Sequence, residues 1–245
     1  MSDWSSIDKV LQDSRTFTAP WEAKLQTLGG NQGTSASTAL DFAKERSLIR
    51  AIILGPTDSL TEFSSYVKKR TIEEIRKNSR SIRNCHEIDV VNSVATSAWT
   101  EAVARLLGIP FKTLGASQSV FDSETHQENL TVLFRYIFSF SRLDAMQELA
   151  LRRNAVQANE RLRKAINEVC EAIKCSAFAH LLLHRHRGDS SDDVLREHGS
   201  ELLQRLFESG KTVEEVVSLV SLLAVQIVVP SVFAVSCLNT SRLPE

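Results

Sequence analysis

Residues that turn or break the chain are scarce in this sequence. Nine glycines and five prolines are spread over 245 residues. Because tight turns depend heavily on these two residue types, a chain with so few of them favours long helices over many short strands. Its length is sufficient to bury a sizeable core. The sequence therefore predicts an all-α protein, built as a multi-helix array.

Apolar residues recur at three- and four-residue spacing through most of the chain, which is typical of helices with one buried face. Gly108 is expected to take the left-handed conformation that ends a helix, before Pro110. Thr212 and Glu215 have the spacing of a capping box at the start of the last helix. The predicted helices span residues 60–78, 88–108, 124–140, 144–177 and 192–209, and the last begins at Thr212 and includes 216–235.

The first 57 residues differ from the rest. We expect short helices near residues 5–12 and 39–54, separated by a loop rich in Gly, Ser and Thr over residues 29–38. The chain is therefore divided into an N-terminal helix and loop region, residues 1–57, and a helical core, residues 58–245.

Residues 216–235 are apolar and about long enough to cross a bilayer, which takes ~20 residues. This stretch contains Gln226, Pro230 and several serines and has no flanking basic clusters, so we interpret it as a helix buried inside the protein, with no membrane span. The N-terminus has no secretory signal pattern. Four cysteines without disulfide spacing indicate free thiols and a cytoplasmic location: Cys85, Cys170, Cys175 and Cys237.

Three polar motifs are candidates for metal or phosphate sites. The glycine-rich loop at residues 29–33 lacks the lysine of a phosphate-binding loop and is interpreted as a surface loop. His180 and His184 have the spacing of zinc ligands on a helix, but neighbouring arginines oppose a cation. The aspartates at 189, 192 and 193 are better explained as helix-capping acids than as a magnesium cluster. We therefore expect no metal site.

A basic segment runs from Lys68 to Arg83, interrupted by Glu73 and Glu74. It lacks the aromatic residues that stack on bases, and the net charge of the whole chain is −1. We interpret this segment as a solvated helix face and expect no nucleic-acid partner.

Several stretches, taken in order, resemble one known family. They are residues 9–21 (KVLQDSRTFTAPW), 66–75 (YVKKRTIEEI), 88–92 (IDVVN), 107–113 (LGIPFKT) and 201–217 (ELLQRLFESGKTVEEVV). Together these are similar to the C-terminal cytochrome P-450-type, heme-thiolate domain of fungal fatty-acid oxygenases, the linoleate diol synthases or psi-factor-producing oxygenases. The resemblance implies a helical core fragment of that domain, without its N-terminal sheet and its C-terminal heme-ligating part.

The resemblance also implies an activity, the isomerisation of a fatty-acid hydroperoxide in oxylipin or secondary metabolism. In that family, two amides on the helix across the distal face of the heme assist this step. The corresponding positions fall near Ser231 and Ala234, and neither residue is an amide. Gln226, Val229 and Phe233 on the same helix are the candidates for lining a pocket for a fatty acid or another apolar small molecule.

The family holds heme through a cysteine thiolate braced by a Glu-x-x-Arg pair. By the resemblance, that cysteine lies downstream of residue 245, and Cys237 lies too early to replace it. Glu73-x-x-Arg76 and Glu160-x-x-Arg163 have the spacing of the pair but are expected to be chance ion pairs in earlier helices. We therefore expect a truncated monooxygenase-like chain that binds no heme alone. A heme-free helical binding or interaction protein is the alternative, and a helical scaffold with an accidental resemblance is a third class.

A truncated domain of this kind should leave the apolar surface of its last helix without partners. The isolated chain is therefore expected to self-associate.

Overall fold

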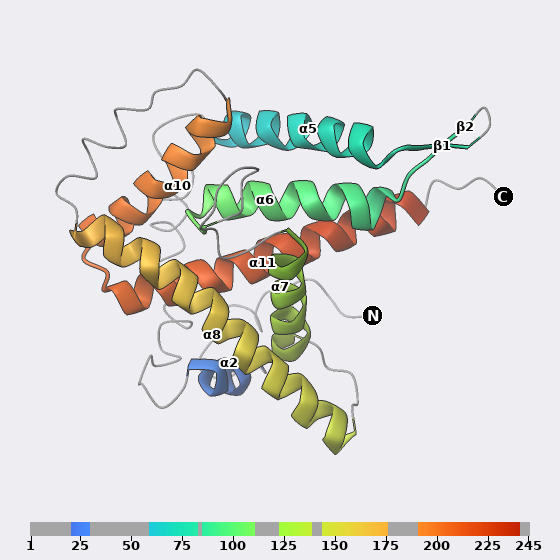
Figure 1. The fold of residues 1–245 in the computed structure, drawn as a ribbon. Helices are drawn as coiled ribbons and strands as arrows, with labels where there is room; N and C mark the ends of the chain where they lie inside the picture. The colour runs from blue at the N-terminus through green and yellow to red at the C-terminus, as the bar shows by residue number, and fades with distance from the viewer. Residues whose placement is uncertain are drawn as a thin grey trace, which may run out of the picture.

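The computed structural model describes residues 21–29, 59–82, 85–110, 123–138, 144–175 and 191–240. These residues are almost entirely helical, so the predicted all-α class is confirmed (Figure 1). The predicted helices near residues 5–12 and 39–54 lie outside the described residues, as does the boundary at residue 57. The described helices are α2 (Glu22–Gly29), α5 (Ser59–Asn78), α6 (Thr96–Leu106), α7 (Ser123–Phe138), α8 (Ala145–Cys175), α10 (Ser191–Glu208) and α11 (Val213–Thr240).

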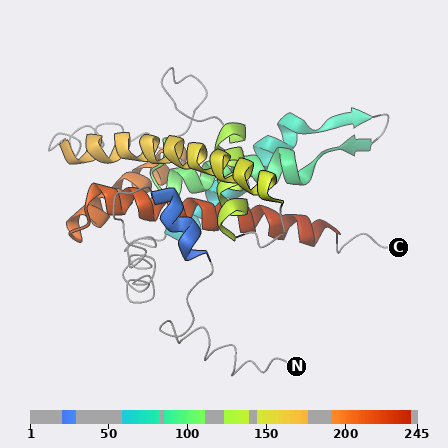
Figure 2. The ribbon, with the colours of Figure 1, turned by 90° about the horizontal axis from the view of Figure 1, so that it is seen from below.

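The helices form a layered array around one main core. α5 packs on α6, and α6 packs on α11. α10 contacts both α5 and α6 (Figure 1). α8 and α7 cross on the other side of α11, and α2 lies against both of them (Figures 1 and 2). The main core contains leucines and valines from α6, α7, α8, α10 and α11, and Leu130, Leu162 and Leu202 are completely buried in it. α2 is joined to this core, since the Asn159 side-chain amide donates to the Leu28 carbonyl at 3.0 Å.

α11 is the most apolar helix of the described part. By length and composition, Val213–Val232 could cross a membrane, and half of this stretch is buried against other helices. The hydroxyls of Ser221 and Ser231 donate to carbonyls of their own helix, each at 2.7 Å, so neither serine prevents burial. The interpretation of this stretch as a core helix agrees with its packing against α8, α7 and α6.

The expected exposed face of the last helix is not found in the part of α11 whose side chains are described. There, Pro230 and Ala234 are exposed, and the remaining residues are buried or half-buried. α8, α7 and α6 cover the apolar surface that we had expected to lack partners. The large exposed apolar side chains lie elsewhere: Leu60, Ile72, Ile75, Val90, Met146 and Leu149.

Two features between α5 and α6 were not predicted. A short antiparallel hairpin, β1 (Arg80–Ile82) and β2 (Cys85–Glu87), projects from the helices (Figures 1 and 2). The π-helix η1 (Val90–Ala95) then precedes α6. The prediction of one regular helix over 88–108 was therefore wrong in its first turns. Asp89 caps η1 by accepting from the backbone N–H groups of Val91 and Asn92, and these hydrogen bonds lower the pKa of its carboxyl.

Two predicted helix-end signals are confirmed. Gly108 has a φ of 69°, the left-handed conformation expected after α6. Thr212 and Glu215 form the capping box, with the Thr212 N–H donating to the Glu215 carboxylate at 2.8 Å. The hydrogen bonds that this carboxylate accepts from the backbone N–H and the hydroxyl of Thr212 lower the pKa of Glu215.

Candidate functional site

The predicted site residues lie on the C-terminal half of α11. Gln226 is half-buried, and Val229 is 5% exposed and part of the main core. The Ser231 hydroxyl already donates to the Ile227 carbonyl, and Ala234 is exposed. The side chain of Phe233 is outside the described part. Gln226 and Val229 are three residues apart on one side of the helix, and the role of this group remains a prediction.

An ion pair fixes the start of α11 against α8. Arg163 of α8 donates to the Ser218 hydroxyl at 3.0 Å and forms an ion pair with Glu214, both on α11. We had considered Arg163 only as the chance partner of Glu160, one turn earlier on the same helix. The structure gives it an interhelical role, because its guanidinium spans the packed surface between α8 and α11.

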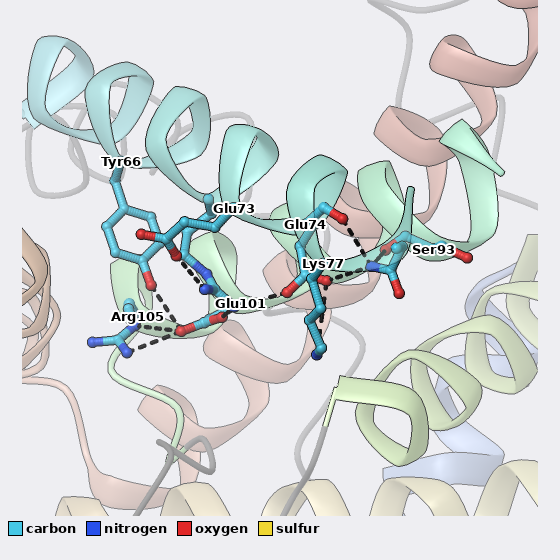
Figure 3. A network of polar contacts seen from close by, with 9 residues as sticks. Tyr66, Glu73, Glu74, Lys77, Ser93, Glu101 and Arg105 are labelled. Atoms are coloured by element: carbon cyan, nitrogen blue, oxygen red, sulfur yellow. Dashed lines mark hydrogen bonds and ion pairs between the residues drawn. The ribbon is translucent and has the colours of Figure 1, made fainter. Parts of the chain in front are cut away.

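A polar cluster lies between α5 and α6, around Glu101 (Figure 3). One oxygen of the Glu101 carboxylate accepts from the Tyr66 hydroxyl at 2.8 Å and from Arg105 at 2.9 Å. The other oxygen pairs with Arg70 at 2.7 Å. Tyr66 is completely buried, and the Arg105 guanidinium lies 5.3 Å from the centre of its ring. Each carboxylate oxygen is thus engaged within the protein, and this arrangement locks two helices together.

The cluster extends along α5 towards η1. Arg70 also binds Glu73 and Glu74 on its own helix. Glu74, only 4% exposed, in turn accepts from the Asn78 side-chain amide at 2.9 Å (Figure 3). The same amide is 3.4 Å from the Ser93 carbonyl of η1. A continuous chain of polar contacts therefore joins α6, α5 and the π-helix.

This cluster corrects the interpretation of the basic segment. Lys68, Lys69 and Arg76 are exposed as expected, but the Arg70 side chain is only 19% exposed. Burial opposes the charged form of Arg70, but the hydrogen bond to Glu73 and the nearby charges, Glu101 above all, outweigh it and raise the pKa of the guanidinium. Glu73 forms an ion pair with Arg70, three residues earlier on α5. The Arg76 of the Glu-x-x-Arg spacing is therefore not the only arginine within its reach.

A second group of buried polar side chains lies on α6 and α7. His126 is 1% exposed, and its burial lowers the pKa of the imidazole to about 4, so the ring is neutral near pH 7. Thr96, Thr100 and Asn129 are also buried, and the hydroxyls of both threonines and the Asn129 amide nitrogen have no hydrogen-bond partner within the described part of the chain. Sequence reasoning missed all four, because isolated polar residues within apolar stripes carry no local signal of burial.

The described cysteines do not fit the thiolate ligand of a heme. Cys170 is buried in the main core, and burial raises the pKa of its thiol to about 11, which keeps it protonated. Cys85 is exposed on the hairpin. The described residues contain no group of three or more His, Cys, Asp and Glu side chains that could hold a metal ion. The histidine and aspartate motifs at which no metal was expected, His180, His184 and 189–193, fall outside the described side chains.

An all-helical array and a long apolar helix crossing its middle agree with the sequence resemblance to the fungal fatty-acid oxygenases, and comparison with curated proteins supports that class. Psi-producing oxygenase A of Aspergillus fumigatus is 26% identical over 222 residues, which cover 87% of this chain and 20% of that protein. The same oxygenase of Emericella nidulans is 23% identical over 226 residues, covering 89% and 20%. The bifunctional dioxygenase (DOX)-epoxy alcohol synthase (EAS) of Fusarium oxysporum is 25% identical over 220 residues, covering 87% and 16%.

The chain spans about a fifth or less of the length of these relatives. No protein-family model matches it, and no solved structure matches it.

Proposed function

We propose that this chain is a helical unit of the heme-thiolate part of a fatty-acid oxygenase, acting in oxylipin or secondary metabolism. The observation that carries the proposal is the 26% identity over 222 residues to a psi-producing oxygenase, spread over nearly the whole chain. Its ligand would be a fatty acid or another apolar molecule, bound beside the C-terminal half of α11. Gln226, Val229 and Phe233 are the residues proposed to line that site.

We also propose that these 245 residues bind no heme through their own cysteines. Cys170 supports this, because its thiol is completely enclosed by core side chains, which leave no room for a heme beside it. Ser231 and Ala234 also lack the amide donors of the distal helix. Catalysis of hydroperoxide isomerisation by this chain alone is therefore not proposed.

A photoreactive fatty-acid analogue tests the ligand site. Labelled peptides from the purified chain should come from residues 226–233 of α11, and Phe233→Ala should reduce the labelling several-fold. α10, which also packs against α11, supplies the control peptide 202–208. Equal labelling of both peptides, or labelling that excess unlabelled fatty acid does not reduce, would argue against the site.

Hemin titration tests the second part of the proposal. The chain should give no Soret band of a thiolate-ligated heme, and Cys170→Ser should leave the spectrum unchanged. If the chain did give the spectrum of a thiolate-ligated heme, and one of the four Cys→Ser variants lost it, the proposal that the chain binds no heme through its own cysteines would be refuted.

The alternative function is a heme-free helical binding or interaction protein. The burial of Cys170 in the main core and the exposure of Cys85 on the hairpin favour it as the second candidate. Specific fatty-acid labelling of α11 without a heme spectrum is compatible with both candidates. Restoration of isomerase activity on adding the remaining parts of a relative would select the first.

A further inference from the structure

The outer face of α5 concentrates positive charge. α5 lies at the edge of the array, with α6 on one side of it (Figure 1). Lys68, Lys69 and Arg76 are exposed on the helix, and Arg80 is exposed where the hairpin begins. Lys68 and Lys69 are adjacent, and Arg76 follows Lys69 by seven residues, about two helical turns, so these three cations lie on one side of α5.

The polar cluster around Glu101 explains why this face is cationic. α5 also carries acidic residues, but Glu74 is buried, and both Glu73 and Glu74 bind Arg70. The cluster therefore engages both acids, burying Glu74 and pairing Glu73, whose side chain is 41% exposed, with Arg70, so that neither fully offsets the outward lysines and Arg76. A chain with a net charge of −1 thus carries a local basic surface.

Two large apolar side chains interrupt this basic surface. Ile72 is 40% exposed and Ile75 is 42% exposed, and both lie between Lys68 and Arg76 along the helix. An exposed isoleucine alone needs no explanation. A pair of them flanked by cations is the arrangement found on helices that lie in the headgroup region of anionic membranes.

From this juxtaposition, we infer that the outer face of α5 docks on an anionic lipid surface. Lys68 and Arg76 would contact the phosphates and carboxylates of the headgroups, while Ile72 and Ile75 would enter the boundary with the acyl chains. A polyanion such as a nucleic acid would use the cations but would gain nothing from the isoleucines. This inference does not depend on the proposed function, and the binding expected is peripheral and reversible.

Vesicle co-sedimentation of the full chain tests the inference. At about 0.1 M salt, vesicles with about 30% phosphatidylserine should retain the protein at least about tenfold better than pure phosphatidylcholine. The charge-reversed variant K68E/R76E should lose at least about tenfold of this partitioning. The variant I72S/I75S should lose several-fold on the same vesicles but bind a heparin column as the unchanged chain does.

Matched controls keep the experiment decisive. R161E/K164E makes the same change in charge on the exposed side of α8 and should bind within about twofold of the unchanged chain. Circular dichroism verifies that each variant keeps its helices. Equal retention by both vesicle types, an equal loss in the α8 variant, or no effect of I72S/I75S would each overturn the inference.

Discussion

At the scale of single residues, the Glu101 side chain joins partners from both α5 and α6. Its carboxylate accepts from Tyr66, Arg70 and Arg105, and its side chain is 9% exposed. Removing one partner of a buried ionic cluster costs more than the cluster contributes as a whole, because the remaining charges stay buried without compensation.

Replacing Glu101 with Gln should therefore lower the free energy of unfolding by about 3 kcal/mol. The neutral amide cannot balance both arginines, although it keeps the shape of the side chain. Urea unfolding followed by circular dichroism measures the change. Glu160→Gln, an exposed position on α8, should change stability by less than about 0.5 kcal/mol. Similar effects of the two substitutions would contradict the role given to the cluster.

His126 should make the fold sensitive to acid. Its pKa is about 4 in the folded protein and ordinarily 6.5, so below pH 6.5 the unfolded chain binds a proton that the folded chain does not. Stability should fall as the pH decreases from 6.5 to about 4, by up to about 3 kcal/mol from this residue. His126→Leu should flatten that part of the profile, while replacing the exposed His86 with Gln should not. An unchanged slope in His126→Leu would show that other groups control acid sensitivity.

At the scale of elements, α6 and α10 approach each other through two glycines. A Cβ added to Gly199 of α10 would lie 2.1 Å from the Arg105 carbonyl, and one added to Gly108 would lie 2.8 Å from the Gly199 carbonyl. These contacts involve backbone atoms, which cannot move aside as the end of a flexible side chain does. The two glycines therefore set the separation of the two helices.

Gly199→Ala should destabilise the protein by about 3 kcal/mol or more, although alanine is the better helix former by about 1 kcal/mol. Gly210→Ala is the matched comparison. Gly210 has a φ of 88° with no atom within 4 Å of an added Cβ, so its cost is restricted to backbone strain, about 1–2 kcal/mol. Thermal unfolding of both variants measures the difference, and a Gly199→Ala protein as stable as the unchanged chain would contradict the close approach.

At the scale of the whole molecule, exposed apolar side chains are distributed over α5, η1 and the start of α8 rather than along α11. Met146 is 75% exposed and Leu149 is 43% exposed near the beginning of α8, which extends past the other helices (Figure 1). Apolar groups on separate elements support weaker association than one continuous patch.

Self-association of the isolated chain thus remains a prediction. Its expected origin is now the exposed apolar side chains at the start of α8 rather than the apolar face of α11. At micromolar concentration, the sedimentation coefficient should increase with concentration, and Met146→Ser with Leu149→Ser should reduce that increase. Two substitutions at exposed polar sites of α8, Glu160→Gln and Gln157→Ser, should not. A single monomeric species across the concentration range would contradict self-association.

The sequence by itself determined the helices and the ends that were confirmed. Apolar spacing, the glycine after α6 and the Thr212–Glu215 capping box act within one or two turns, so neighbouring residues contain all the information they need. The same local reasoning identified α11 as the most apolar helix, whereas the choice of this helix as the place to look for a ligand came from the family resemblance. It did not identify η1, because the extra residue in a π-turn is stabilised by contacts such as the one between Asn78 and Ser93, 15 positions apart.

Only the tertiary structure decided which polar residues face inwards. Tyr66 meets Glu101 35 positions away, and Arg163 meets Ser218 55 positions away. In the sequence, Arg70 cannot be told apart from Lys68, Lys69 and Arg76, since all four occupy one basic helix. Packing of α5 on α6 brings Arg70 to a buried carboxylate and leaves the other three in solvent. The interior position of a charge depends on a partner that folding alone brings within reach.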